Sequence, residues 1–472
     1  MSDRPVFRWA TNSARMLVGT VVSVVAVVAV VTAVSVPWPT VEKEPVSVSA
    51  VPAPAPSVIV CDGPLLSIGR DVTNVAALAV ATPQRLIAGV SAGAQPPEES
   101  MLSVAELSSG EGPAVFTAQP ENRARVDVAA AGAATVAADD LAGFAASACR
   151  PPLMESWLIG GSARTGAADL VLLSNPGVVP ATVQLTVFGA EGASAPPGGT
   201  DVVIPAGSQR VLPLAGLVSG EESPVLRVSA VGSPIHASLQ TSLTRTLTPG
   251  GVDQVGPVAE PLPAQTITGI SVTRSPGAEG ASDAATVLRL LAPSSETSAL
   301  VTVTPVGRAE PALEPQTVPL VAGQPVEIEL GGLAVGSYTV AVTAGEPILA
   351  AVWQTTGFEE GSDFAWYLPS PTVSVPSIFA APSGPPPALT LVNPSSEPVD
   401  ISVASEDGSY RLELSVPAQA SMTARLSPRT VYVLDPGGND ILAGLSLTGD
   451  GALAGIPVWP ADAAAPEITV YP

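Results

Sequence analysis

The sequence is poor in the side chains that most enzymes use for acid–base, nucleophilic or metal chemistry. Its 472 residues include one histidine, His236, and two cysteines, Cys61 and Cys149. Protein zinc sites are built mainly from cysteine and histidine, and this chain has too few of either to form one. We therefore expect no metal and no cofactor, and the sequence has no glycine-rich phosphate loop.

Charge is also scarce and one-sided. Charged residues make up 13% of the chain, and the formal net charge is −23. Because nucleic acid and anionic lipid surfaces repel an acidic protein, neither is an expected partner. Apolar residues make up 46% of the chain and can supply several hydrophobic cores.

One long segment lacks charge altogether. It begins at Met16 and ends at Val36, which is long enough to cross a ~30 Å hydrocarbon core as a helix. Three basic residues precede it, namely Arg4, Arg8 and Arg15. The positive-inside rule then places residues 1–15 in the cytoplasm and the rest of the chain outside it.

A cleaved signal peptide is the alternative interpretation of this segment. The sequence Ala33-Val34-Ser35 fits the small-x-small cleavage rule, but the apolar run exceeds the usual ~7–15 residues. Residues 37–57 follow, with six prolines. Such a linker is stiff and extended, and at ~3.1 Å per residue it would hold the first domain about 60 Å from the membrane.

Both cysteines lie after the apolar segment. An even number of cysteines in an exported chain favours a disulfide, here between Cys61 and Cys149, although two separate buried thiols are the alternative. Closing so long a loop would stabilise the fold by about 4–5 kcal/mol in the chain-entropy account.

The body of the chain repeats one pattern. The copies read LVLLSNPGVVPATVQLTVFG from Leu170, LRLLAPSSETSALVTVTPVG from Leu288 and LTLVNPSSEPVDISVASEDG from Leu389. Each has an apolar run, a turn containing proline, and a stretch in which apolar residues alternate, as in Val183 and Leu185. Proline cannot donate to a sheet ladder, and asparagine bonds the turn through its side chain. The pattern predicts strand, turn, strand.

Copies recur at roughly 100 residues, the size of an antiparallel β-sandwich. We therefore predict an all-β fold of tandem immunoglobulin-like sandwich domains after one N-terminal transmembrane helix. Tandem domains usually fold independently. The expected domains are a disulfide-stapled divergent repeat at residues 58–156 and three repeats at residues 157–262, 263–371 and 372–472.

The sequence has one match to a catalytic motif. Residues 89–93, GVSAG, resemble the nucleophile elbow around Ser91, but that motif needs a helix next, and Pro96 and Pro97 prevent one. We expect Ser91 to end a strand and enter a turn. His236 lies in a predicted strand of another domain, and we expect it at the surface or on an edge strand. A triad of these residues is disfavoured, so no catalytic residue is predicted.

Acidic and aromatic residues receive structural interpretations first. The acids of residues 406–409 and 435–440 are typical of turns, although calcium binding there is an alternative. Trp157, Trp366 and Trp459 lie near comparable junctions, where we expect them to fill sandwich ends or domain junctions and not to form a ligand platform.

The order of these parts resembles an actinobacterial family of single-pass envelope proteins that carry a domain of unknown function, number 5719 in its series. The resemblance rests on the anchor, CDGP at Cys61, SACRPP around Cys149, WLIGG from Trp157, and the repeat from Leu170. It implies an exported, membrane-anchored protein without an assigned activity.

These observations favour a membrane-anchored extracytoplasmic scaffold or interaction protein of the bacterial cell envelope, without catalysis. The expected contacts are the membrane, through residues 16–36, and an envelope protein or glycan. A carbohydrate-binding or adhesive module is the first alternative, although aromatic residues are only 4% of the chain. A hydrolase with a hidden carboxylate pair is the second, because any two acids can converge in a fold.

Overall fold

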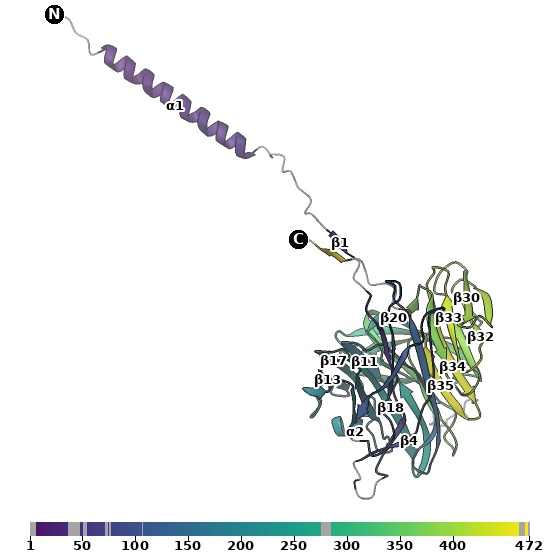
Figure 1. Ribbon diagram of the computed structural model, residues 1–472. Helices are drawn as coiled ribbons and strands as arrows, with labels where there is room; N and C mark the ends of the chain where they lie inside the picture. The colour runs from purple at the N-terminus through teal and green to yellow at the C-terminus, as the bar shows by residue number, and fades with distance from the viewer. Residues whose placement is uncertain are drawn as a thin grey trace, which may run out of the picture. The chain divides into compact units, whose positions relative to one another are not determined.

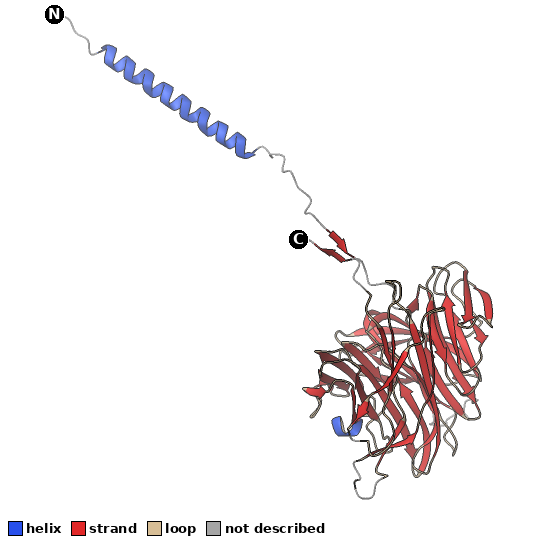
Figure 2. Cartoon of the chain, viewed as in Figure 1, coloured by secondary structure: helices blue, strands red, loops and turns tan. Residues whose placement is uncertain are grey.

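The computed structural model describes residues 6–35, 48–50, 54–70, 74, 77–105, 107–274, 285–461 and 468–470. They belong to two compact units, of which one comprises Met1–Pro52 with Pro466–Pro472 and the other comprises Ala53–Ala465. We call the compact unit Ala53–Ala465 the body, and the terms first to fourth unit refer to the four successive parts of this body. Figure 2 shows that the body is built of strands and their connecting loops, with the short helix α2 (Leu214–Leu217) at one edge.

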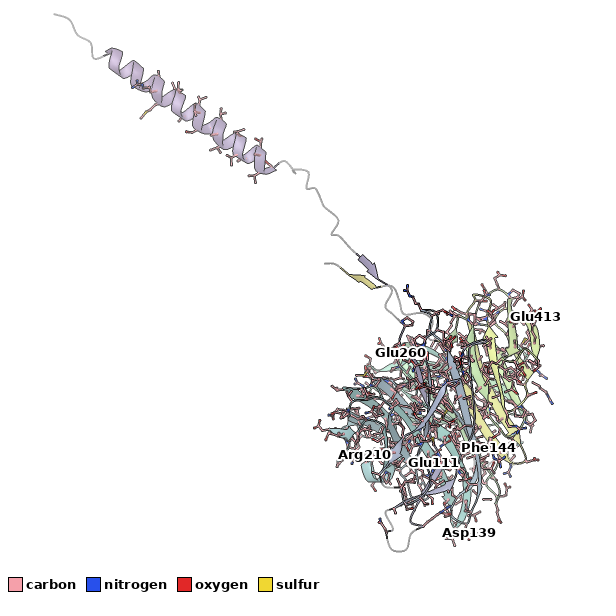
Figure 3. All side chains as sticks on the ribbon, viewed as in Figure 1. Glu111, Asp139, Phe144, Arg210, Glu260 and Glu413 are labelled. Carbon is pink, nitrogen blue, oxygen red and sulfur yellow. A yellow bond between two sulfur atoms is a disulfide. The ribbon has the colours of Figure 1, made fainter. Side chains whose placement is uncertain are left out.

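The first compact unit contains the apolar helix α1 (Val6–Ser35). Its stretch Ser13–Ser35 has a mean hydropathy of 2.7 and is not buried against protein. Apolar side chains project from the helix on all sides (Figure 3), as a lipid-facing surface requires. By length and composition this helix can cross a membrane, as the sequence predicts, and Val36 lies outside the described residues.

Hydroxyl groups within α1 are satisfied inside the helix. Thr20 donates to the carbonyl of Met16 at 2.7 Å, and Ser23 donates to that of Gly19 at 2.9 Å. Such bonds remove the cost of placing a polar group in hydrocarbon. In the same compact unit, β1 (Val48–Ala50) pairs antiparallel with β36 (Ile468–Val470). The rest of the predicted linker before β1, residues 37–47, lies outside the described residues.

The body contains four successive units, whose colours run from blue to yellow in Figure 1. The first unit has β2 (Ser57–Val60), β3 (Leu65–Ile68), β4 (Leu78–Thr82), β5 (Arg85–Val90), β6 (Glu98–Met101), β7 (Ser103–Val104), β8 (Ala114–Ala118), β9 (Val128–Ala137) and β10 (Ala142–Ala148). The second unit has β11 (Glu155–Ile159), β12 (Leu170–Asn175), β13 (Ala181–Gly189), β14 (Gly192–Ser194), β15 (Val202–Ile204), β16 (Ser208–Pro213), α2 (Leu214–Leu217), β17 (Val225–Val231), β18 (His236–Arg245) and β19 (Thr248–Val255).

The other two units follow in the same way. The third unit has β20 (Leu262–Val272), β21 (Thr286–Leu291), β22 (Thr297–Pro305), β23 (Gln316–Leu320), β24 (Val326–Glu329), β25 (Gly336–Thr355) and β26 (Phe364–Tyr367). The fourth unit has β27 (Thr372–Val373), β28 (Ser377–Ala381), β29 (Pro387–Val392), β30 (Val399–Ser405), β31 (Arg411–Val416), β32 (Ser421–Arg425), β33 (Thr430–Asp435), β34 (Ile441–Gly449) and β35 (Ala452–Pro457).

The units share one antiparallel pairing scheme. One sheet runs β11-β17-β13 in the second unit, β20-β25-β22 in the third and β28-β33-β30 in the fourth. The other sheet runs β16-β12-β18-β19, β24-β21-β25-β26 and β32-β29-β34-β35, respectively. The long strand β25 belongs to both sheets of its unit. A reduced form, β2-β8-β6 and β5-β9-β10, occurs in the first unit.

The predicted all-β sandwich architecture is thus confirmed, with two sheets around each apolar core. The alternating residues Val183 and Leu185 face the core of the second unit, as the sequence predicts. The strand order differs from the immunoglobulin order, in which the first strand pairs with the second. Here β11, the first strand of the second unit, pairs with β17, and the corresponding pairs are β20 with β25 in the third unit and β28 with β33 in the fourth. The domain boundaries drawn from the sequence stay predictions.

The units pack in a closed ring. The last strands of the units, β10, β19, β26 and β35, contact one another in cyclic order. Glycine permits this approach, because a Cβ on Gly143 would lie 2.6 Å from the Asp363 carboxylate. That carboxylate accepts hydrogen bonds from the amides of Val252 and Phe144, on two neighbouring last strands. Asp253 likewise accepts one from the amide of Trp366 at 2.7 Å.

Each unit also covers the outer face of the next unit's second sheet. Leu170 and Leu172 of β12 pack on Leu66 and Leu78 of the first unit. Ala129 and Ala131 of β9 pack on Ala380 and Val431 of the fourth unit, and this contact closes the ring. The four units thus pack as one compact unit, Ala53–Ala465, and independent folding of the tandem domains stays a prediction.

The predicted disulfide is confirmed. Cys61 and Cys149 are bonded and buried, so the disulfide links the end of β2 to the end of β10. The predicted turn role of asparagine is also confirmed. The side-chain amide of Asn175 donates to the carbonyl of Val179 at 2.8 Å, and Asn393 donates to that of Glu397 at 2.7 Å.

Candidate ligand-binding cleft

A cleft of about 320 Å³ lies between the second and third units. Its floor is the outer face of the sheet β24-β21-β25-β26, and its wall comes from the second unit, around Gly161–Asp169 and the end of β18. The register of the strands determines which side chains form the floor. Val287 pairs with both Glu329 and Trp353, and Trp353 pairs with Trp366. Directly paired residues point to the same face of a sheet, so these side chains form one row.

Arg289 lies two residues further along β21, on the same face. Its side chain is 2% exposed and donates to the carbonyls of Pro224 and Gly161, both at 2.9 Å. It also donates to the carboxylate of Glu327 at 2.7 Å and lies 4.6 Å from the ring centre of Trp366. Burial lowers the pKa of Arg289, although the charge of Glu327 opposes this effect. Arg289 thus joins the two units at the base of the cleft.

Asp169 is the buried acid of the wall. Its carboxylate accepts hydrogen bonds from the amides of Ser162 at 2.7 Å and Ser242 at 2.8 Å. Burial raises the pKa of Asp169 to about 7, although these amides favour the charged form. Gly161 has a φ of 70°, and a Cβ there would lie 2.5 Å from the Asp169 carboxylate. Only glycine fits this close approach.

Four aromatic rings line the cleft, from Trp353, Phe358, Phe364 and Trp366. Two of them carry a guanidinium from the protein itself, because Arg289 lies over Trp366 and Arg245 lies 4.9 Å from the centre of Phe358. Trp353 contacts Phe364 with ring centres 6.0 Å apart and remains partly exposed. Trp353 therefore offers aromatic surface to a ligand.

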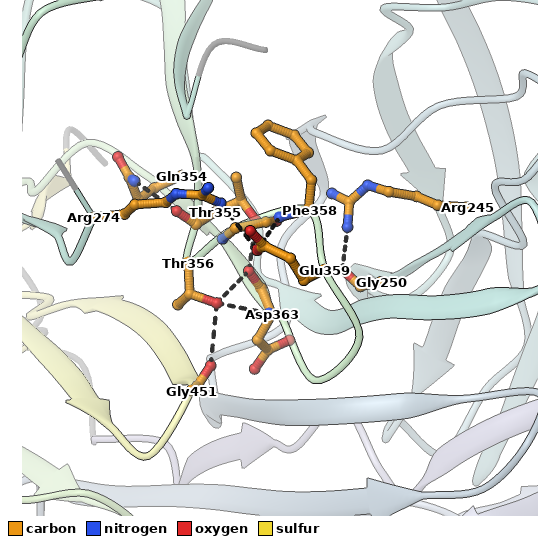
Figure 4. Close-up of polar contacts among 11 residues, drawn as sticks. Arg245, Gly250, Arg274, Gln354, Thr355, Thr356, Phe358, Glu359, Asp363 and Gly451 are labelled. Carbon is orange, nitrogen blue, oxygen red and sulfur yellow. Dashed lines mark hydrogen bonds and ion pairs between the residues drawn. The ribbon is translucent and has the colours of Figure 1, made fainter. Parts of the chain in front are cut away.

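The loop that carries Phe358 is held at the rim by polar contacts (Figure 4). Arg274 donates to the carboxylate of Glu359 at 3.0 Å, and the same carboxylate accepts the amide of Phe358. At the other end of the loop, the amide of Asp363 donates to the hydroxyl of Thr356 at 2.8 Å. These bonds fix the rim of the cleft against the strands below it.

The cleft also contains polar groups without a partner. The hydroxyl of Thr241 belongs to a side chain that is 1% exposed, and within the described residues it has no hydrogen-bond partner. Glu222 and Glu329 are exposed carboxylates, and neither has an ion pair in the described part of the chain. Arg164 is an exposed guanidinium and, across the same residues, also has no ion pair. Such groups are available to a ligand.

Residues 104–429, which include both sides of the cleft, match the family described as "Family of unknown function (DUF5719)". The chain belongs to the DUF5719 family. No curated protein matches it. The match confirms the resemblance to this domain of unknown function, and the family's description assigns no activity to the cleft.

His236 of this DUF5719 protein was placed wrongly by the sequence interpretation. Its side chain is 1% exposed, and its Nε2 lies 2.7 Å from the carboxylate of the equally buried Asp62. Burial alone would raise the pKa of Asp62, but the hydrogen bond and charge from His236 lower it below its usual value. The physical reason is that β18 is a central strand whose outer face is covered by the first unit.

The other residues singled out in the sequence lie apart from the cleft, except Trp366, which lines it. Ser91 follows the end of β5 and enters a turn, as predicted, and its hydroxyl accepts the amide of Asp127. Trp157 and Trp366 are buried in the core that the second and third units share, as expected for junction residues. Trp459, which follows β35 of the fourth unit, has its ring centre 4.7 Å from the guanidinium of Arg150, which follows β10 of the first unit.

The acidic turns are likewise structural in the described residues. Asp407 accepts hydrogen bonds from Ser405 and Ser409, which lower its pKa to about 2. Within the described residues, no group of three or more His, Cys, Asp or Glu side chains has a metal-binding arrangement. The sequence interpretation missed Arg289 and Asp169, although the charge of Arg289 between Leu288 and Leu290, in an apolar strand, was a visible signal.

Proposed function

We propose that this DUF5719 protein is a membrane-anchored interaction protein of an actinobacterial cell envelope, with its body outside the cytoplasm. The arginines that precede the apolar segment support this orientation through the positive-inside rule. The disulfide between Cys61 and Cys149 supports it as well, because disulfides persist in oxidising compartments. α1 would then be a retained anchor.

The observation that carries a binding role is the cleft between the second and third units. It combines partly exposed aromatic surface at Trp353, unpaired charged groups at its edge, and a rigid base held by Arg289. A volume of about 320 Å³ falls within the range of small-molecule sites, ~300–1,000 Å³. We assign ligand binding to this cleft and a scaffold role to the ring around it.

Binding without catalysis is part of the proposal. The single histidine is occupied in a buried pair with Asp62, and both cysteines form the disulfide. General acid–base and nucleophilic catalysis need a poised group within reach of a substrate. Asp169 has a raised pKa, but both of its carboxylate oxygens accept backbone amides, which suits a structural role.

A carbohydrate-binding module is the second candidate, and the partly exposed ring of Trp353 favours it. Sugar rings stack on aromatic faces while carboxylates bind their hydroxyl groups, and Glu329 shares the row of Trp353. Binding of a neutral sugar such as cellobiose to the cleft would identify this candidate.

Orientation and binding are tested in native membranes. A reporter fused after Pro472 should be active only outside the cytoplasm, and carbonate washing should leave the protein in the membrane pellet. A photo-crosslinking residue at Val287, in the cleft floor, should trap a specific partner or ligand. The same residue at the exposed Leu300, on another sheet, is the matched control. Identical adducts at both positions, or none at Val287, would argue against the cleft as a binding site.

A further inference from the structure

The cleft already uses its aromatic rings to hold cations. Guanidinium groups of the protein lie over Trp366 and Phe358, at 4.6 Å and 4.9 Å from the ring centres. A cation over an aromatic face is attracted by the ring quadrupole, most strongly at tryptophan. Trp353 has the same ring chemistry, is partly exposed, and in the described residues carries no guanidinium over its face.

A carboxylate is positioned to complete the contact. Glu329 and Trp353 both pair with Val287, from opposite sides, and therefore flank it on one face of the sheet. Neighbouring strands are ~4.8 Å apart, so the two backbones are about 10 Å apart. A cation above Val287 can thus contact the ring of Trp353 and the carboxylate of Glu329 together.

The charge balance of the cleft favours a positive ligand. Its lining carboxylates are Asp169, Glu222, Glu327 and Glu329, and its lining arginines are Arg164 and Arg289. Arg289 is neutralised by Glu327. Arg164 opposes a cation at the mouth, Arg245 lies over the lining ring of Phe358, and Asp169 is partly protonated at neutral pH because burial raises its pKa to about 7. The attraction therefore comes from Glu222 and Glu329, which have no ion pair in the described residues, and from the net charge of the whole chain, −23. Long-range attraction would raise the local concentration of a cationic ligand.

The buried hydroxyl of Thr241 points independently to a ligand. A buried polar group without a partner costs free energy, and in native proteins such groups usually bond water or a ligand. The Thr241 hydroxyl has no partner within the described residues and lines the same cleft. A ligand with a hydrogen-bonding group beside its cationic end could bond the Thr241 hydroxyl while its cation contacts Trp353 and Glu329.

We propose that the cleft binds an organic cation, an amine or guanidinium group, which lies on Trp353 and is paired with Glu329. This inference rests on the proposed function, because it names the ligand class of the same cleft. The cation belongs either to a small free molecule or to a basic side chain of a partner protein.

The test uses the full chain in nanodiscs of uncharged lipid, with binding followed by calorimetry and tryptophan fluorescence. The probes are agmatine for a free cation, a short lysine- and arginine-containing peptide for a basic side chain, and cellobiose for a neutral sugar. We expect agmatine or the peptide to bind, with an affinity that falls as salt increases. Tighter binding of the peptide would identify a protein partner, and equal or tighter binding of agmatine a free molecule.

Variants locate the contact. Trp353→Leu should weaken cation binding by about 3- to 30-fold, the span of measured cation–aromatic contributions. Glu329→Gln should also weaken it and should reduce its salt dependence. Glu329 is exposed, so this variant stays informative if Trp353→Leu misfolds. Glu260→Gln, at an exposed acid that does not line the cleft, is the matched control and should bind normally.

The outcomes separate the ligand class from the site. Cellobiose binding that Trp353→Leu abolishes would overturn the cation and leave the cleft as a sugar site. Absence of cation binding at millimolar concentrations, or cation binding that both variants leave unchanged, would overturn the cation proposal. The proposed function fails separately, if Val287 crosslinks nothing in native membranes.

Discussion

Two interfaces between units follow the same scheme and differ in what fills them. At the second–third interface the floor strand β21 presents Arg289, and the aromatic row beside it leaves a cleft of about 320 Å³. At the third–fourth interface the equivalent strand β29 presents Thr390. A Cβ on Gly269 of the third unit would lie 2.9 Å from that threonine hydroxyl.

Small hydroxyl residues close the third–fourth interface. Ser271 and Ser446 share a hydrogen bond of 2.6 Å between their hydroxyls, and Thr268 and Ser370 share one of 2.8 Å. Gly444 has no room for a Cβ beside the Thr268 hydroxyl. In the described residues the backbone arrangement is thus common to both interfaces, and side-chain size on the outer face decides which is closely packed and which holds a cleft.

Removal of residues 372–472 should have the largest effect, because it exposes faces of both neighbouring units in the ring. We expect the remaining chain to lose cooperative unfolding or to aggregate, as measured by thermal unfolding and light scattering. Removal of only Pro466–Pro472, which belongs to the other compact unit, should leave the transition unchanged. A truncated chain that melts like the full chain would show that the units fold independently.

The free energy of unfolding should depend on pH through the buried acids, in contrast to the third–fourth interface, which is filled by hydroxyl groups. Burial raises the pKa values of Asp169 and Asp363 to about 7, from 3.8, and that of Asp253 well above 3.8. The folded state then binds more protons than the unfolded state between pH 3.8 and about 7, so stability falls as pH rises through this window. Asp62, whose pKa is lowered, changes its contribution only below 3.8.

The melting temperature should therefore be higher at pH 5 than at pH 8. Each raised acid contributes at most about 4 kcal/mol to the difference, since one pKa unit is ~1.4 kcal/mol. Asp169→Asn should flatten the slope in part. A melting temperature that is constant or rises over this range would contradict the assignment of these acids.

Arg289→Met should destabilise the second–third interface by about 2–3 kcal/mol, because two buried carbonyls lose their donor. The cost is moderated because Glu327 is 36% exposed and water can solvate it. The matched control is Arg227→Met. Arg227 also pairs with a glutamate, Glu155, and lies over a tryptophan, but both side chains are 43% exposed. We expect a change below about 1 kcal/mol there. If Arg289→Met and Arg227→Met lower the free energy of unfolding equally in denaturant, Arg289 has no special role at this interface.

A larger side chain should destabilise the third–fourth interface but not the second–third interface. Gly444→Ala should cost about 1–3 kcal/mol, since the added methyl meets the Thr268 hydroxyl in a packed interface. Val287→Leu adds a methylene at the cleft floor, where space is available, and should change stability by less than about 0.5 kcal/mol. If Val287→Leu lowers the free energy of unfolding in urea more than Gly444→Ala does, our assignment of which interface is closely packed is wrong.

The sequence predicts the local elements well, because strand and turn signals are short-range. The alternation around Val183 and the Asn175 turn were identified this way, whereas the disulfide was inferred from the even number of cysteines. The alignment of the repeats was less successful. It matched Leu170 with Leu288 and Leu389, but the core residue in the second unit is Val171. A run that is buried on both faces has no alternation to set its register.

The interfaces could not be predicted, because their contacts join distant parts of the chain. His236 meets Asp62 across 174 residues, and Arg289 meets Gly161 across 128. Nothing local shows which outer sheet faces are covered by another unit. A polar residue within an apolar strand, such as Arg289, indicates only that a buried partner exists.

The most direct test of the account is hydrogen–deuterium exchange on the full chain in nanodiscs, with and without agmatine. We expect slow exchange in the last strands of all four units without ligand. Added agmatine should slow exchange further only in segments that line the cleft, such as those around Ser242, Glu329 and Trp353. Protection at the third–fourth interface instead, or fast exchange in the last strand of any unit, would contradict a closed ring with a binding cleft between its second and third units.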